Sequence, residues 1–163
     1  MKPVQTILLL LAICAYVEAQ TQMTSFASIT LSTDVSGSTV APVLVFTPAT
    51  TVASGGTITL TMPPGYFLGT VTSIASGVNS LTATSTPAAN ASSTSIVLTT
   101  GGAASGTAAI TMTLTGLTLG AAQAATTEGV KMSSSADAAL TPGINAAAII
   151  SRMTSFASIT LFP

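Results

Sequence analysis

Residues 56 to 63 read GTITLTMP, and this stretch decides the fold class. Its apolar residues, Ile58, Leu60 and Met62, alternate with threonines, so in an extended chain they share one face. A helix, with 3.6 residues per turn, would distribute the same side chains around its axis. The stretch therefore predicts a half-buried β-strand, with a glycine turn before it and a proline turn after it.

The same alternation fills residues 108 to 120, AAITMTLTGLTLG. The apolar face that starts at Ile110 is shifted by one position at Gly116 and continues at Leu117 and Leu119. A glycine at a change of phase predicts a β-bulge within a long strand.

Other stretches predict further short strands separated by turns. The expected strands are APVLVFTP (41–48), YFLGTVTSI (66–74), SLTATS (80–85), STSIVLTT (93–100) and EGVKMSS (128–134). Turn residues lie between them at 34–37, 54–56, 63–65, 101–102 and 141–143. The sequence VLVF is apolar on both faces, which favours a central strand. The alanine-rich segments 120–126 and 144–150 are expected to be short helical turns or loops.

Regularly spaced short strands predict an all-β fold. We expect an immunoglobulin-like antiparallel β-sandwich of seven to eight strands over residues 20–150, including an N-terminal strand at 23–31. The remaining residues, 151–163, are expected to supply one extra terminal strand.

The first residues have the parts of a secretory signal peptide. Lys2 supplies a positive charge, residues 7 to 15 form an apolar run, and residues 17 to 19 form a cleavage pattern before Gln20. The apolar run is much shorter than the roughly 20 residues that cross a bilayer, so no membrane span is expected. We expect residues 1–19 to be removed, and the mature chain to be secreted to the extracellular space or the cell surface.

Few groups that could support catalysis or bind a metal remain after that cleavage. The single cysteine, Cys14, lies in the signal peptide, and the chain has no histidine. General acid–base catalysis needs a positioned pair of titratable groups, and a calcium site needs six or more oxygen ligands. The sequence therefore predicts no enzyme, cofactor or metal, and no basic surface for nucleic acid. The charged residues of the mature chain are Asp34, Glu128, Lys131, Asp137 and Arg152.

Three segments carry a resemblance to a known class of protein. They are VLVFTPATTVASGGTITLTMPPGYF (43–67), TSIVLTTGGAASGTAAITMTLTGLTLG (94–120) and EGVKMSSSAD (128–137). In order and composition they resemble the Thr/Ala/Gly-rich, cysteine-free immunoglobulin-like repeats of large secreted surface proteins of protists and algae. The resemblance implies a tandem module that begins with a strand such as TSFASITLS. It implies no catalytic or ligand residues.

One nine-residue sequence, MTSFASITL, occurs twice, at residues 23–31 and 153–161. Strand alternation places Met23, Ala27, Ile29 and Leu31 on one face and Phe26 on the opposite face. The second copy repeats this pattern, so the candidate assembly residues form two sets, namely Met23, Phe26, Ile29 and Leu31, and Met153, Phe156, Ile159 and Leu161.

Two copies of one strand imply two equivalent positions, or one position and two candidates for it. In the second case the spare copy can be donated to another subunit by β-augmentation, and a head-to-tail contact of this kind forms a filament if it does not close. Three alternatives stay open. The second copy pairs within its own subunit, belongs to a longer tandem array, or is an error of sequence assembly.

Asn90-Ala91-Ser92 is an N-glycosylation sequon in the turn-rich segment STPAANASST. In a secreted loop we expect it to carry a glycan, which would compensate for the low surface charge. Covalent glycans are therefore a possible modification, and an unmodified loop is the alternative.

These features predict a structural subunit of an extracellular filament or surface coat that polymerises with itself. The alternative is a monomeric adhesive or glycan-binding surface module. For a ligand site in a loop, the sequence offers only Tyr66 and Phe67, next to residues 63–65.

Overall fold

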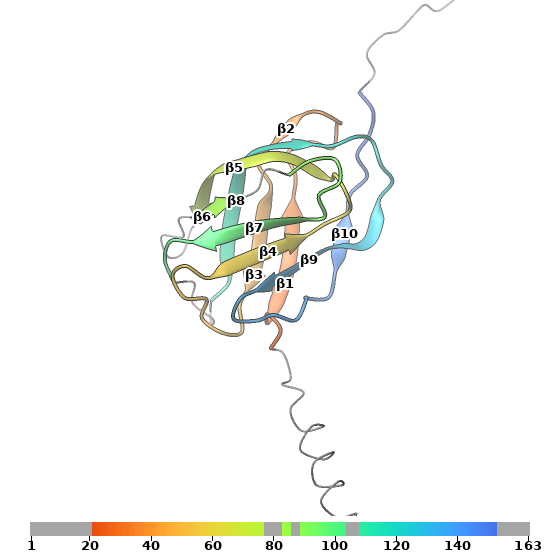
Figure 1. The fold of residues 1–163 in the computed structure, drawn as a ribbon. Coiled ribbons are helices and arrows are strands. Elements are labelled where there is room, and N and C mark those ends of the chain that lie inside the picture. Colours follow the sequence, from red (N-terminus) through yellow and green to blue (C-terminus); the bar gives the residue numbers. More distant parts are fainter. Residues whose placement is uncertain (1–20, 77–82, 86–88, 104–107, 153–163) are drawn as a thin grey trace, which may run out of the picture.

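The computed structural model describes residues 21–76, 83–85, 89–103 and 108–152, and within these ranges the chain forms strands, turns and loops but no helix. The strands form two five-stranded antiparallel sheets that pack face to face (Figure 1). The predicted all-β, antiparallel β-sandwich is confirmed. Accordingly, nothing in the described part of the chain qualifies as a membrane-crossing helix.

The first sheet is built around β8. Its strands are β1 (Ser25–Thr30), β2 (Thr39–Val40), β3 (Val43–Thr47), β5 (Phe67–Ser76) and β8 (Ile110–Leu119). One edge of β8 pairs with β3 and the short β2, and the other pairs with β5. On its far side β3 pairs with β1, so the VLVF strand is central, as predicted. Among the described strands of this sheet, β1 lies at an edge.

The second sheet has β4 at its centre. In order, its strands are β10 (Ile144–Ala146), β9 (Thr126–Ser134), β4 (Thr57–Thr61), β7 (Ser95–Thr100) and β6 (Ala83–Ser85). The edge strand β10 lies next to β1 of the other sheet. The segment 144–150 was expected to be a short helical turn or a loop; its first three residues instead form the strand β10. Pairing with β9 satisfies the backbone of this segment and overrides its alanine content.

The immunoglobulin-like detail of the prediction is not confirmed. The orders β1–β3–β8–β5 and β10–β9–β4 match the spatial orders A-B-E-D and G-F-C of an immunoglobulin sandwich, and β7 follows β4 in the second sheet. However, β7 lies where an immunoglobulin sandwich has strand C′, which precedes strand D in the chain. Here β5, in the D position, comes before β7. The ten described strands are the eight that the sequence predicts, β6 among them, and two short ones, β2 and β10.

The core lies between the sheets and is lined by the predicted alternating residues. In β4 and just after it, Ile58, Leu60 and Met62 are buried, whereas the threonines between them are half-buried. In β8, Ile110, Met112, Leu114, Leu117 and Leu119 are fully buried. Burial of apolar surface at about 25 cal/mol per Å² is the main stabilising term for such a fold.

The glycine of β8 occupies the predicted irregularity. Gly116 has a φ of 91°, a left-handed conformation that other residues rarely adopt. Opposite it, the register of β5 slips between Gly69 and Ser73. A Cβ atom on Gly116 would collide with the carbonyl oxygen of Thr70. The bulge lets both halves of β8 direct leucines into the same core.

The described chain begins and ends at opposite ends of the sandwich (Figure 1). Gln22, just before β1, forms a parallel bridge with Ala139 in the connection between β9 and β10. Ile150, near the end of the described chain, forms a parallel bridge with Val35, which follows β1. The chain thus enters next to the start of β1 and leaves next to its far end.

Candidate assembly site

The first copy of the repeated sequence forms the edge strand β1 and contributes to the core. Phe26 is buried and lies opposite Phe46 of β3, and Ile29 lies opposite Leu44. Met23, just before the strand, is also buried. Ile29 and Leu31 are partly buried and pack against the core. All four predicted residues of this copy therefore contact the sandwich interior.

The predicted division of the strand into two faces is wrong. Ala27, which simple alternation places with Ile29 on the inner face, is exposed, and Phe26 is buried on the side of Ile29. The register with β3 passes from Phe26 to Ser28, so Ala27 is an extra, bulged residue. Because the bulged Ala27 does not count in the alternation, the side chains of Phe26 and Ile29 lie on the same face.

Two residues before the copy bind the β9–β10 connection. The Thr21 hydroxyl donates to the carbonyl oxygen of Ala136 at 3.0 Å, and the N–H of Ala139 donates to the Thr21 carbonyl at 3.1 Å. The Gln22 side-chain amide donates to the carbonyl oxygen of Leu140. These contacts fix the start of β1 at one end of the sandwich.

The C-terminal segment is fixed at the other end. The Ile150 N–H donates to the Asp34 carbonyl at 2.9 Å, and the Ser36 N–H donates to the Ile150 carbonyl at 2.9 Å. Ile149 is buried and bridges to Gln123. Only Ser151 and Arg152, both exposed, follow in the described chain.

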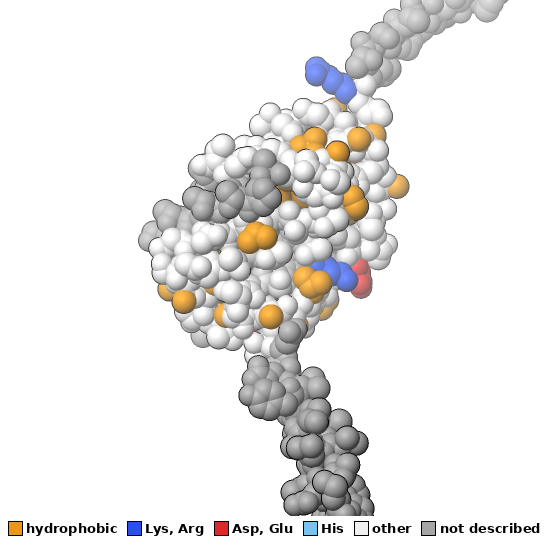
Figure 2. Space-filling view, viewed as in Figure 1, with side chains coloured by type: hydrophobic (Ala, Val, Ile, Leu, Met, Phe, Trp, Pro, Cys, Tyr) orange, Lys and Arg blue, Asp and Glu red, His pale blue; other side chains and the backbone are white. Residues whose placement is uncertain are grey.

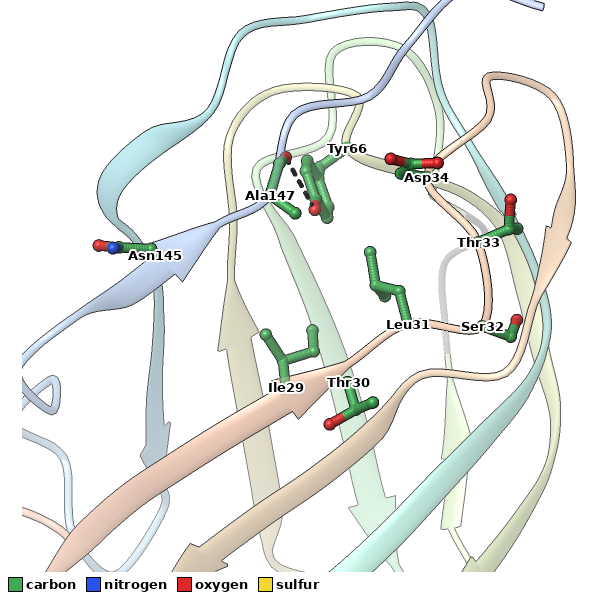
Figure 3. A pocket seen from close by; sticks show the side chains of 9 residues that line it. All are labelled: Ile29, Thr30, Leu31, Ser32, Thr33, Asp34, Tyr66, Asn145 and Ala147. Atoms are coloured by element: carbon green, nitrogen blue, oxygen red, sulfur yellow. Dashed lines mark hydrogen bonds between the residues drawn. The ribbon is translucent and has the colours of Figure 1, made fainter.

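A groove of about 390 Å³ separates the end of β1 from the segment after β10 (Figure 3). Ile29 and Leu31 extend into it from one wall, and Asp34 and Tyr66 lie at its far end. The groove marks the edge at which the two sheets are open, between β1 and β10. It is lined by Ile29, Thr30, Leu31, Ser32, Thr33, Asp34, Tyr66, Asn145 and Ala147.

Both aromatic residues considered for a loop site are core residues. Tyr66 is 1% exposed and Phe67 is fully buried, and their rings pack edge to face with centroids 4.9 Å apart. The Tyr66 hydroxyl donates to the Ala147 carbonyl at 3.1 Å, which ties the segment after β10 to the core. Burial raises the pKa of Tyr66, so the phenol stays a neutral donor. This pair cannot form an exposed aromatic platform.

The second copy of the sequence, residues 153–161, lies outside the described residues, as does the predicted signal peptide. The anchor residues Met153, Phe156, Ile159 and Leu161 therefore stay predictions from the sequence. The strand to which they correspond, β1, is described in full.

Asn90 lies in an exposed turn. Its side-chain oxygen accepts hydrogen bonds from the Ser92 N–H at 2.9 Å and from the Ser92 hydroxyl at 2.8 Å. The Asn90 N–H in turn donates to the Ser93 hydroxyl at 2.9 Å. This compact Asx-turn presents the sequon at the surface, where a glycan would extend into solvent.

The carboxylates are separated and have structural roles or face solvent. Asp137 is fully buried, and its Oδ2 accepts the backbone N–H groups of Ala49 and Thr50 at 2.9 and 3.1 Å. It thereby fixes a turn of the distant β3–β4 connection. Over the described ranges, no three potential metal-ligating side chains come together.

The described surface carries few charged side chains and small scattered apolar patches (Figure 2). Comparison with protein-family models, with curated proteins and with solved structures found no match for this chain. The protein is therefore classified by its fold alone. It is a two-sheet antiparallel β-sandwich, and its described chain begins and ends at opposite ends of the sandwich.

Proposed function

We propose that this protein is a structural subunit of an extracellular filament or surface coat, joined head to tail by donation of a terminal strand. The observation that carries the proposal is the place where the described chain ends. Ile150 lies at the end of the sandwich opposite to the start of β1, and the second copy of the repeated sequence begins at residue 153, after two connecting residues. If the second copy extends from one end of a subunit and pairs with the next subunit, further subunits can add in one direction.

The surface supports this proposal. Its low charge gives little repulsion between copies, since a chain with three basic and four acidic residues has a formal net charge of −1. An N-linked glycan at the exposed Asn90 would compensate for this low charge and keep such an assembly soluble. The intact mass of the secreted protein, compared with that of Asn90→Gln, tests this part; a difference of no more than the one methylene group that glutamine adds would contradict it.

Removing residues 153–163 tests the proposal. We expect the full mature chain to form particles whose size grows with concentration in sedimentation velocity experiments. The chain that ends at Arg152 retains all the described strands and should sediment as a folded monomer over the same concentration range. Polymers that persist in the shortened chain would contradict the proposal.

The groove next to β1 favours one second candidate, a monomeric adhesive or glycan-binding module. Asp34 and Asn145 lie at a concave surface that also exposes apolar side chains, a combination suited to a sugar ring. Glycan-array binding by a protein that stays monomeric at high concentration would favour this function. Loss of that binding in Asp34→Ala would assign it to the groove.

A further inference from the structure

We infer that the donated strand occupies, in the next subunit, the position that β1 occupies in its own chain, with Ser151 and Arg152 replacing Thr21 and Gln22. This inference rests on the proposed function and identifies the acceptor site. The acceptor is the edge of β3 together with the β9–β10 connection.

The side chains that β1 buries are all present in the second copy. The two copies are offset by 130 positions, since the first starts at residue 23 and the second at residue 153. Phe156 and Ile159 therefore correspond to Phe26 and Ile29, which lie opposite Phe46 and Leu44 of β3. An edge that accepts one copy has the apolar surface to accept the other.

The correspondence extends beyond the identical residues. Thr21 binds the carbonyl oxygen of Ala136 through its hydroxyl, and Ser151, at the corresponding position, also carries a hydroxyl. Gln22 donates a side-chain N–H to the carbonyl oxygen of Leu140, and Arg152, its counterpart, is a side chain of N–H donors only. Both replacements retain the donor that the acceptor requires.

The length of the connection excludes this position within the same chain. To repeat the contacts of β1, the second copy must start next to the β9–β10 connection and run in the same direction. Ile150 is held at the opposite end, next to Asp34 and Ser36. The three Cα–Cα steps from Ile150 to residue 153 span at most about 11 Å, whereas the six residues of β1 extend over roughly 20 Å. The second copy can therefore fill this position only in another chain.

The exposed apolar residues lie where such a junction would form. Among the described residues, the large hydrophobic side chains with high exposure are Leu140 (46%) and Ile150 (49%), at opposite ends of the sandwich. Ile150 directly precedes Ser151, and Leu140 accepts the hydrogen bond that Arg152 would replace. Donation brings Ile150 of one subunit to the region of Leu140 of the next.

The chain's own strand competes with the donated one. A tethered strand acts at an effective concentration in the millimolar range, so the full chain should assemble only when it is concentrated, as at a surface. Removal of residues 20–31 abolishes the competition. We expect this deletion to lower the concentration at which assembly begins by at least tenfold.

Two adjacent substitutions in the second copy test the acceptor. Phe156 corresponds to buried Phe26, and Ala157 corresponds to the exposed bulge residue Ala27. We expect Phe156→Asp to raise the onset concentration at least tenfold, and Ala157→Asp to assemble like the unaltered chain. Both variants retain β1, so their own sandwich folds, and circular dichroism verifies this. Light scattering over a concentration series measures the onset.

The outcomes separate this inference from the proposed function. If assembly needs residues 153–163 but the two aspartate variants behave alike, the strand is accepted elsewhere, and only the inference is overturned. If the full chain stays monomeric while the chain without residues 20–31 assembles with the circular dichroism of the folded sandwich, the acceptor is supported and spontaneous polymerisation of the full chain is contradicted. If neither assembles at any concentration, both are overturned.

Discussion

In the chain that ends at Arg152, Phe26→Asp is expected to abolish stable folding, whereas Ala27→Asp leaves the stability nearly unchanged. Phe26 is 7% exposed and faces Phe46 across the strand pair, so an aspartate there loses the aromatic contacts and buries a carboxylate among apolar groups. Truncating a buried phenylalanine alone costs about 3–5 kcal/mol, and an unpaired buried charge adds to this cost. The sum approaches the 5–15 kcal/mol by which domains are typically stable.

Ala27→Asp is the matched control for this substitution. It introduces the same charge one position later, but on a bulged residue whose side chain is exposed. Surface substitutions of this kind usually change the free energy of unfolding by about 0.5 kcal/mol or less. Urea denaturation followed by circular dichroism measures the free energy of unfolding of the two variants, Phe26→Asp and Ala27→Asp. Equal losses would mean that the bulge is misplaced and that the strand alternates simply through Ala27.

The second large effect is expected at Asp137. Replacing it with alanine removes the acceptor of two backbone N–H groups, those of Ala49 and Thr50, and leaves a gap at a fully buried position. Hydrogen bonds to a charged group contribute about 1.5–3 kcal/mol, so we expect a loss of about 3 kcal/mol in the free energy of unfolding.

Asp137→Asn should be less harmful than Asp137→Ala. An asparagine retains one acceptor oxygen for the two N–H groups, and the other oxygen of the aspartate, Oδ1, is buried without a hydrogen-bond partner in the described structure. Its replacement by an amide nitrogen therefore breaks no described hydrogen bond. Chemical denaturation of both variants measures the difference. A loss for asparagine equal to that for alanine would show that the negative charge, not the hydrogen bonding, stabilises the turn.

Local alternation predicted the strands because it depends only on residues near one another in sequence. The residues of GTITLTMP have the predicted burial, and the VLVF strand has the predicted central position. Gly116 lies at the predicted bulge. The bulge at Ala27 could not be predicted in this way. No glycine or change of polarity marks it, and the slip arises from pairing with β3.

The roles of Asp137 and Tyr66 depend on contacts between residues distant in sequence, so the sequence alone did not reveal them. The backbone groups that Asp137 binds lie 87 to 88 residues away in sequence, so its neighbours could not reveal which loop it stabilises. Tyr66 follows a proline-glycine turn typical of a surface loop, yet its ring fills the core and its hydroxyl binds a segment distant in sequence. The repeated sequence indicated a candidate assembly strand. The opposite positions of Gln22 and Ile150, on which the inferred acceptor depends, required the fold.

An engineered disulfide tests most directly whether the second copy joins one subunit to the next. In β1, Ser28 pairs with Val45 of β3, and the residue that corresponds to Ser28 in the second copy is Ser158. The predicted mature chain has no cysteine of its own. In the full chain we would introduce Val45→Cys with Ser158→Cys, and as a control Val45→Cys with Ser28→Cys.

On non-reducing gels, the control pair should form a bond within one chain and migrate as a monomer. The account predicts that Val45→Cys with Ser158→Cys, oxidised at assembling concentrations, gives a ladder of covalent dimers and larger oligomers that a reductant returns to monomers. A ladder should be absent when Val45→Cys is replaced by Ala125→Cys, an exposed position remote from β3 in sequence. A monomer with a disulfide between residues 45 and 158 of the same chain would contradict strand donation between subunits.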